Sequence, residues 1–100
     1  MKFEVELAEK ADRDLRNIFF YIAVDLSAPE NAERQINRLW DAILSLDELP
    51  ERYRRYEDEP WYSRGMRVLP IDNFVILYIP YLEEKVAVSY THLRAHETLA

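Results

Sequence analysis

The sequence contains no cysteine, which excludes disulfide bonds and thiolate chemistry and is typical of a protein of the reducing cytoplasm. It also contains no apolar run approaching the roughly 20 residues that a membrane-spanning helix needs, so we expect no contact with a membrane. Residues 1–10 carry several glutamates, whereas a signal peptide begins with basic residues and continues with an apolar stretch. We therefore expect a cytoplasmic location.

The charge of the chain is acidic overall but uneven. Its formal net charge is −6, which argues against a protein that coats nucleic acid through bulk electrostatics. Within residues 52–67, however, basic side chains outnumber acidic ones, so an anionic partner is expected to bind there. The basic residues of this stretch are Arg52, Arg54, Arg55, Arg64 and Arg67.

The length of 100 residues and the apolar fraction of 49% predict one domain with a single modest core. Residues 2–7 alternate between apolar and charged side chains, which predicts a strand with one solvated face. From Ala8 the apolar residues recur at helical spacing as far as Asp25 or Leu26. That spacing predicts an amphipathic helix.

A second helix is predicted after Ser27. Ser27 and Glu30 have the spacing of a capping box, and Pro29 falls in the first turn, where its missing N–H costs no helical hydrogen bond. Pro50 marks the end of the helical pattern. The two helical segments together predict an antiparallel hairpin. The apolar stripe of the second helix consists of Ala32, Ile36, Leu39, Trp40, Ile43 and Leu46.

The second half of the chain begins with a polar, aromatic-rich loop at residues 51–63 and then predicts strands. Strand-like runs at 65–71, 74–81 and 85–90 are separated by short turns, which favours a three-stranded antiparallel meander. The predicted order is therefore β-α-α-β-β-β. This is an α+β domain in which a helical hairpin packs on a small antiparallel sheet.

Three short motifs in this half resemble those of a known family. They are RGMR at residues 64–67, LPI at 69–71 and FVILY at 74–78, which follow a loop rich in tyrosine and arginine. Together with the element order, they resemble the RelE/ParE superfamily of toxins, and the ParE branch more closely. The resemblance covers residues 3–88, by pattern in the first half and by actual residues in the second.

The resemblance implies the toxin component of a type II toxin–antitoxin system, with no cofactor. Such a toxin would inhibit growth by binding a cellular target such as DNA gyrase and would be neutralised by a cognate antitoxin. The alternative from the other branch is a ribosome-dependent mRNA endoribonuclease, for which ribosome and mRNA would be the partners. A third alternative is an inactive, truncated relic.

The nuclease alternative requires several cations and a proton-transferring group on the sheet. The predicted strand at 65–71 supplies Arg67 near its centre, and the strand at 74–81 supplies no cation. Arg67 is thus the one candidate catalytic residue, and it has two interpretations. Its guanidinium would bind an antitoxin carboxylate or a phosphate, or it would pair with an acid of residues 57–59 and fix the loop to the sheet.

The arginine- and aromatic-rich loop is the predicted surface for a target or the antitoxin. Arginine, tyrosine and tryptophan are enriched in protein interfaces, and they also stack on single-stranded bases. Because acidic residues lie beside them, we expect a protein contact before loop packing, and RNA last. The candidate residues are Arg52, Arg54, Arg55, Tyr56, Trp61, Arg64 and Arg67.

The C-terminal segment departs from the family pattern, which continues with an arginine-containing strand end. We expect the toxin domain to comprise residues 1–90 and residues 91–100 to be a non-native or disordered tail that frays or lies loosely on the surface. His92 and His96 have the spacing of two ligands on one helical face. Without a third ligand in register, no metal site is predicted.

Overall fold

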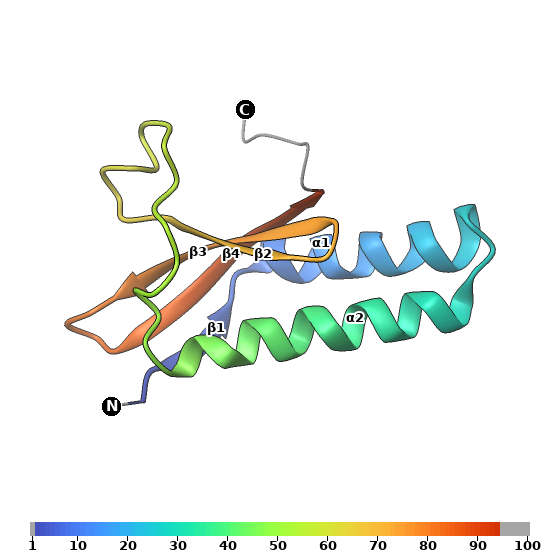
Figure 1. Cartoon of the computed structure of the whole chain (residues 1–100), viewed down its shortest axis with the longest axis horizontal. Helices are drawn as coiled ribbons and strands as arrows, with labels where there is room; N and C mark the ends of the chain where they lie inside the picture. The colour runs from blue at the N-terminus through green and yellow to red at the C-terminus, as the bar shows by residue number, and fades with distance from the viewer. Residues whose placement is uncertain (1, 95–100) are drawn as a thin grey trace.

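The computed structural model describes residues 2–94 and places two helices against one face of a four-stranded sheet (Figure 1). No helix among these residues is both long and apolar enough to cross a membrane. The predicted α+β class and element order are confirmed. The elements are β1 (Glu4–Leu7), α1 (Glu9–Phe20) with a π-helical turn (Tyr21–Asp25), α2 (Pro29–Leu44) with a 3₁₀ turn (Ser45–Asp47), β2 (Arg67–Ile71), β3 (Phe74–Tyr81) and β4 (Val86–Arg94).

The sheet has the strand order β1-β4-β3-β2 and is mixed. The strands β2, β3 and β4 form the predicted antiparallel meander, whereas β1 pairs in parallel with β4. The sheet is therefore not antiparallel throughout, as the sequence had led us to expect. A parallel pair needs a long crossover connection, and here the helical hairpin, the loop and two strands provide it.

The two helices are joined by a reversal in which Ser27 has a different role from the one predicted. Ser27 has a φ of 52° and its N–H donates to the Val24 carbonyl (3.1 Å), so it closes the first helix. The N-cap of α2 is Ala28, and no side chain caps it. The predicted capping box is thus wrong, because the chain uses Ser27 to change direction. Pro29 is in the first turn of α2, as predicted.

The main core lies between the hairpin and the sheet. Tyr78 of β3 is fully buried there, and its hydroxyl donates to the Pro50 carbonyl at 2.5 Å. Burial raises the pKa of Tyr78 to about 12. This hydrogen bond fixes the start of the long loop to the centre of the sheet. The buried residues of the cluster are Leu15, Leu39, Ile43, Leu46, Leu69, Phe74, Ile76, Tyr78 and Ala87.

The strand β4 continues to Arg94, beyond the predicted domain end at residue 90. Thr91 and His92 are buried. One carboxylate oxygen of Asp14 on α1 accepts hydrogen bonds from the Thr91 hydroxyl (2.6 Å) and the His92 N–H (3.0 Å). The expectation of a loose tail is wrong for residues 91–94, because backbone pairing with β3, a polar contact with α1 and the packing of Leu93 on the sheet hold this segment. Residues 95–100, and His96 with them, lie outside the described residues.

Candidate functional site

The loop at residues 48–66 carries most of the predicted site residues and packs beside β2 at one end of the molecule (Figure 1). It is held by backbone hydrogen bonds that extend the sheet past β2. The Val68 N–H donates to the Arg54 carbonyl (2.9 Å), and the Tyr56 N–H donates to the Met66 carbonyl (2.8 Å). The predicted cations and aromatic residues are thereby brought to one place.

Arg67 points into this loop, which agrees with the interpretation that its guanidinium fixes the loop to the sheet. Its Nη1 atom donates to the Tyr53 carbonyl (2.7 Å) and the Glu51 carbonyl (3.0 Å), and its Nη2 atom lies 3.7 Å from the Glu51 carboxylate. Its side chain is 19% exposed. The structure thus shows Arg67 fixing the loop to the sheet. The acid that it pairs with is Glu51, and not one of residues 57–59 as predicted.

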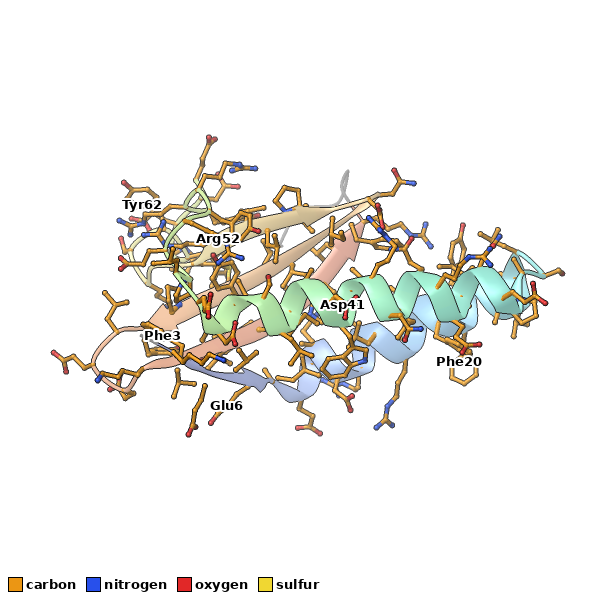
Figure 2. The ribbon with its side chains drawn as sticks, turned by 60° about the horizontal axis from the view of Figure 1, so that its bottom comes forward. Phe3, Glu6, Phe20, Asp41, Arg52 and Tyr62 are labelled. Carbon is orange, nitrogen blue, oxygen red and sulfur yellow. The ribbon has the colours of Figure 1, made fainter. Side chains whose placement is uncertain are left out.

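Arg52 and Arg55 also make contacts within the loop region. The Arg52 guanidinium donates to the Leu49 carbonyl (3.1 Å) and to both oxygens of Ser45 (3.2 and 3.3 Å), where it satisfies acceptors just after α2. The Arg55 guanidinium lies 4.1 Å from the centre of the Tyr62 ring and donates to the Tyr62 carbonyl. Figure 2 shows Arg52 and Tyr62 at this end of the molecule. Both arginines therefore stabilise the conformation of the loop.

The remaining predicted residues divide between the surface and a second apolar cluster. Arg54 and Arg64 are exposed, with the Arg64 guanidinium 5.2 Å from the centre of the Trp61 ring. Tyr56 and Trp61 pack against buried residues on the sheet face that the helices do not cover. The cationic surface that the loop presents is thus smaller than the sequence predicts. The buried residues of the second cluster are Met66, Val68, Leu77 and Ile79.

A cavity of about 260 Å³ lies between this loop and the sheet, bordered by Trp61, Arg64 and two tyrosines. The hydroxyls of Tyr81 and Tyr90 are 2.5 Å apart. Burial, followed by the hydrogen bond with Tyr81, raises the pKa of Tyr90 to about 12. A phenol with a raised pKa is a weaker proton donor at neutral pH. Arg64 is the one cation among the described residues that line this cavity.

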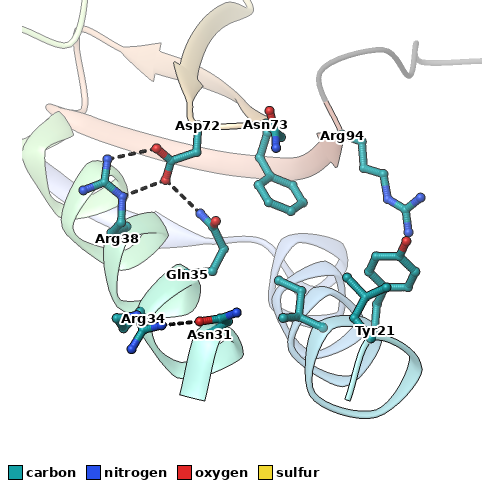
Figure 3. A pocket seen from close by; sticks show the side chains of 11 residues that line it. Tyr21, Asn31, Arg34, Gln35, Arg38, Asp72, Asn73 and Arg94 are labelled. Carbon is teal, nitrogen blue, oxygen red and sulfur yellow. Dashed lines mark hydrogen bonds and ion pairs between the residues drawn. The ribbon is translucent and has the colours of Figure 1, made fainter. Parts of the chain in front are cut away.

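A larger cavity lies at the opposite end of the molecule, and the sequence analysis missed it. This groove, of about 1010 Å³, lies between the end of α1, one face of α2, the β2–β3 turn and the end of β4 (Figure 3). The sequence signal was the helical spacing of its polar residues on α2, which the sequence analysis did not single out. The polar and aromatic side chains that border it are Tyr21, Asn31, Arg34, Gln35, Arg38, Asp72, Asn73 and Arg94.

The groove holds a carboxylate of the chain itself. Arg38 donates to both oxygens of Asp72 (2.7 and 3.0 Å), and the Gln35 side-chain amide donates to one of them (3.0 Å). These hydrogen bonds, with that from Arg38 the strongest cause, lower the pKa of Asp72. Arg34 donates to the side chain of Asn31, and the Arg94 guanidinium lies 4.0 Å from the centre of the Tyr21 ring.

The outer face of the hairpin exposes large apolar side chains. Phe20 is 59% exposed, Leu44 55% and Trp40 37%. Trp40 therefore lies outside the core in which its position in the apolar stripe had placed it. A shallow cavity of about 440 Å³ runs between α1 and α2 on this face, which we call the hairpin surface. Its apolar lining consists of Leu15, Phe19, Phe20, Ile36 and Trp40.

His92 is the one histidine among the described residues, and it is not part of a metal-binding cluster there. Among residues 2–94 no three histidine, aspartate or glutamate side chains lie close enough to hold a metal ion. The His92 Nε2 atom is 2.8 Å from the Ser89 hydroxyl, and burial lowers the pKa of His92 to about 4. His92 thus packs within the fold at the end of β4.

Comparison with known proteins gives a match to a family and to solved structures, two of which are described below. The family described as the ParE toxin of the type II toxin–antitoxin system parDE matches residues 5–95. A structure of the chromosomal ParDE toxin–antitoxin system from Pseudomonas aeruginosa aligns with a TM-score of 0.78 and 19% identity, over 95% of this chain and 98% of that one. The toxin–antitoxin complex RelBE2 from Mycobacterium tuberculosis aligns with a TM-score of 0.70 and 17% identity, over 94% and 99%. The search of curated proteins finds no significant match.

Proposed function

The chain belongs to the ParE toxin family of type II toxin–antitoxin systems, and we propose that it inhibits growth by binding a cellular target and is neutralised by a cognate antitoxin. DNA gyrase is the target that the ParE resemblance suggests. The observation that carries the choice of binding over RNA cleavage is the lack of an available cation on the central strands. Arg67 of β2 is engaged by the loop, and β3 has no lysine or arginine.

The chemistry of RNA cleavage supports this choice. A nuclease must stabilise the charge that develops on the phosphate, and preorganised cations and hydrogen-bond donors are the usual means. The Arg67 guanidinium already donates to two carbonyls and lies beside a carboxylate of its own chain, so a phosphate would have to compete with these contacts. The second cluster, on the sheet face away from the helices, is apolar and suits packing.

We propose that the antitoxin covers the hairpin surface. Monomeric soluble proteins rarely expose large contiguous apolar patches, and larger ones commonly mark interfaces. An amphipathic helix binds such a groove by placing apolar side chains at every third or fourth position. Phe20 and Trp40 are exposed beside the shallow cavity of this surface, and they would be buried by a helix of that kind.

The loop is the proposed contact with the target, with the antitoxin as the alternative partner. Its exposed face presents Arg54, Arg64 and Tyr62, residue types enriched in the centres of protein interfaces. Arg52, Arg55, Tyr56, Trp61 and Arg67 would support this face from beneath, since they make the intrachain contacts described above. Positioned arginine and aromatic side chains lose little conformational entropy on binding, which favours such a contact.

The proposal is tested by expressing the chain alone and together with the product of the reading frame adjacent to its gene. Expression alone is expected to arrest growth, and purified chain to inhibit supercoiling by purified gyrase. Co-expression is expected to restore growth and to yield a complex with a raised melting temperature, because the partner binds only the folded state. Codon-phased mRNA cleavage in a primer-extension assay, if abolished by Arg67→Ala, would contradict this proposal. It would favour the mRNA endoribonuclease instead.

A further inference from the structure

The groove at the far end of the molecule concentrates positive charge in a chain that is acidic overall. Three arginines border it, namely Arg34 and Arg38 from α2 and Arg94 from the end of β4, whereas Asp72 is its one carboxylate among residues 2–94 (Figure 3). The net charge of the whole chain is −6. Local clustering of one charge sign raises the local concentration of ligands of the opposite sign. The groove is therefore suited to an anionic group.

The position of Asp72 shows which anion the groove accommodates. Its carboxylate receives a two-pronged contact from Arg38 and a third hydrogen bond from Gln35. Two parallel N–H donors of a guanidinium match the geometry of a carboxylate. The side chains of Arg38 and Asp72 are 59% and 32% exposed. Ion pairs this exposed contribute little to stability, so a carboxylate from another molecule can exchange with Asp72.

The turn itself does not require a carboxylate at this position. Asp72 has a φ of 54°, in the left-handed region where asparagine is as well tolerated as aspartate. The carboxylate of Asp72 therefore has a role apart from the turn, which is to accept the hydrogen bonds from Gln35 and Arg38. Arg34 lies on the same face of α2, and within residues 2–94 the side chain of Asn31 is its one hydrogen-bond acceptor. Since a guanidinium has five N–H donors, Arg34 retains several for a ligand.

We propose that this groove binds an acidic, apolar peptide segment, and that Asp72 occupies the position of one of its carboxylates while the groove is empty. The lining favours a peptide over a nucleic acid strand, because Ile22, Leu26 and Phe74 add apolar surface for side chains. The chain's net negative charge also opposes a polyanion that carries a charge on every residue. The antitoxin is the source of the segment, and on this point alone the inference rests on the proposed function.

The proposal predicts opposite effects for the two sides of the ion pair. Removing the carboxylate with Asp72→Asn removes a competitor and is expected to tighten binding several-fold. Removing a cation with Arg34→Gln or Arg38→Gln is expected to weaken binding about tenfold, since each loses a charge-assisted hydrogen bond to the ligand. A purely structural ion pair would make Asp72→Asn and Arg38→Gln change binding in the same direction.

The experiment uses the full chain and a fluorescent 12-residue peptide of alternating leucine and glutamate. Its glutamine analogue and a 12-nucleotide oligothymidylate are the comparison probes, and fluorescence anisotropy gives the dissociation constants. The matched control is Arg13→Gln, which removes an exposed arginine of α1 that does not line the groove. We expect the glutamate peptide to bind at least tenfold more tightly than either comparison probe. Arg13→Gln should retain the unmodified affinity, and unfolding curves should show that all variants are folded.

Three results would overturn the inference. They are tighter binding of oligothymidylate than of the glutamate peptide, weaker binding by Asp72→Asn, and no binding of the glutamate peptide at millimolar concentration. The proposed function has a separate readout, since growth arrest and recovery of an antitoxin complex do not involve the peptide. An antitoxin complex that forms equally well with Arg34→Gln and Arg38→Gln would be consistent with the proposed function. It would exclude the groove as a binding site for the antitoxin.

Discussion

His92 lies at the end of β4 with its ring buried, and its Nε2 atom is 2.8 Å from the Ser89 hydroxyl. Burial favours the neutral ring and lowers its pKa to about 4, from an ordinary value of 6.5. The nearby Asp14 acts in the opposite direction but does not outweigh burial. Between these two pH values the unfolded chain binds a proton that the folded chain excludes.

The stability of the protein is therefore expected to fall on acidification. The contribution of His92 is fully present above pH 6.5 and decreases as the pH falls from there toward 4. Between pH 7 and pH 5 the expected loss is roughly 2 kcal/mol, at 1.36 kcal/mol for each pH unit below the unfolded pKa. Urea unfolding of the unmodified chain and of His92→Gln at both pH values measures it. An equal loss in the two proteins would show that other groups cause the dependence.

Arg67 gives a second prediction at the scale of one residue. Replacing it with glutamine removes hydrogen bonds to the Glu51 and Tyr53 carbonyls, which hold the loop against β2. The expected cost is about 2 kcal/mol in the free energy of unfolding, the scale of hydrogen bonds that involve a charged group. Arg64→Gln is the control, because Arg64 is exposed, and it should cost less than about 0.5 kcal/mol. A loss of toxicity in Arg67→Gln at unchanged stability would instead favour a direct functional role.

At the scale of elements, the end of β4 carries the clearest change from the sequence-based expectation. Its last residues pair with β3 and contact Asp14 of α1 through Thr91 and His92. We predict that truncation after Tyr90 costs at least about 2 kcal/mol more than truncation after Arg94, because only the first removes these contacts. Chemical unfolding of the two truncated chains measures the difference. Equal stabilities of the two truncated chains would support the predicted domain boundary at residue 90.

At the scale of the whole molecule, the three proposed contact surfaces occupy different places. The loop lies at one end, the groove at the other, and the hairpin surface along the outer side of α1 and α2, as the positions of Tyr62 and Phe20 in Figure 2 indicate. An antitoxin segment could thus follow the hairpin surface into the groove and leave the loop accessible. The order of the lining residues supports that route, since Tyr21 and Ile22 of the groove directly follow Phe20 of the hairpin surface in the chain.

The hairpin surface supplies a prediction at this scale. Because Phe20 is 59% exposed, Phe20→Ser should change the free energy of unfolding by less than about 1 kcal/mol. The same change should weaken the antitoxin complex at least tenfold, as expected for an apolar anchor worth more than about 1.4 kcal/mol. Leu82→Ser is the matched control, since Leu82 is 51% exposed in the β3–β4 turn, away from this surface. Isothermal titration of the purified partners would compare the two, and equal affinities would exclude the hairpin surface.

The sequence by itself determined the elements and their order. The periods of two and of 3.6 residues depend on the neighbours of each residue in the chain, so they predicted β2, β3 and both helices from local information. The motifs at 64–78 indicated the family for the same reason, since they are contiguous in the chain.

Only the tertiary structure decided which distant segments meet. The pairing of β1 with β4, the contact of Arg67 with Glu51 and the extension of β4 to Arg94 depend on packing that no local pattern contains. The groove is the clearest case. Its side chains come from the end of α1, from α2, from the β2–β3 turn and from the end of β4, and each one alone resembles an ordinary solvated residue. Their proposed role as a site depends on the hairpin packing on the sheet, because that packing brings three arginines and Asp72 to the border of one cavity.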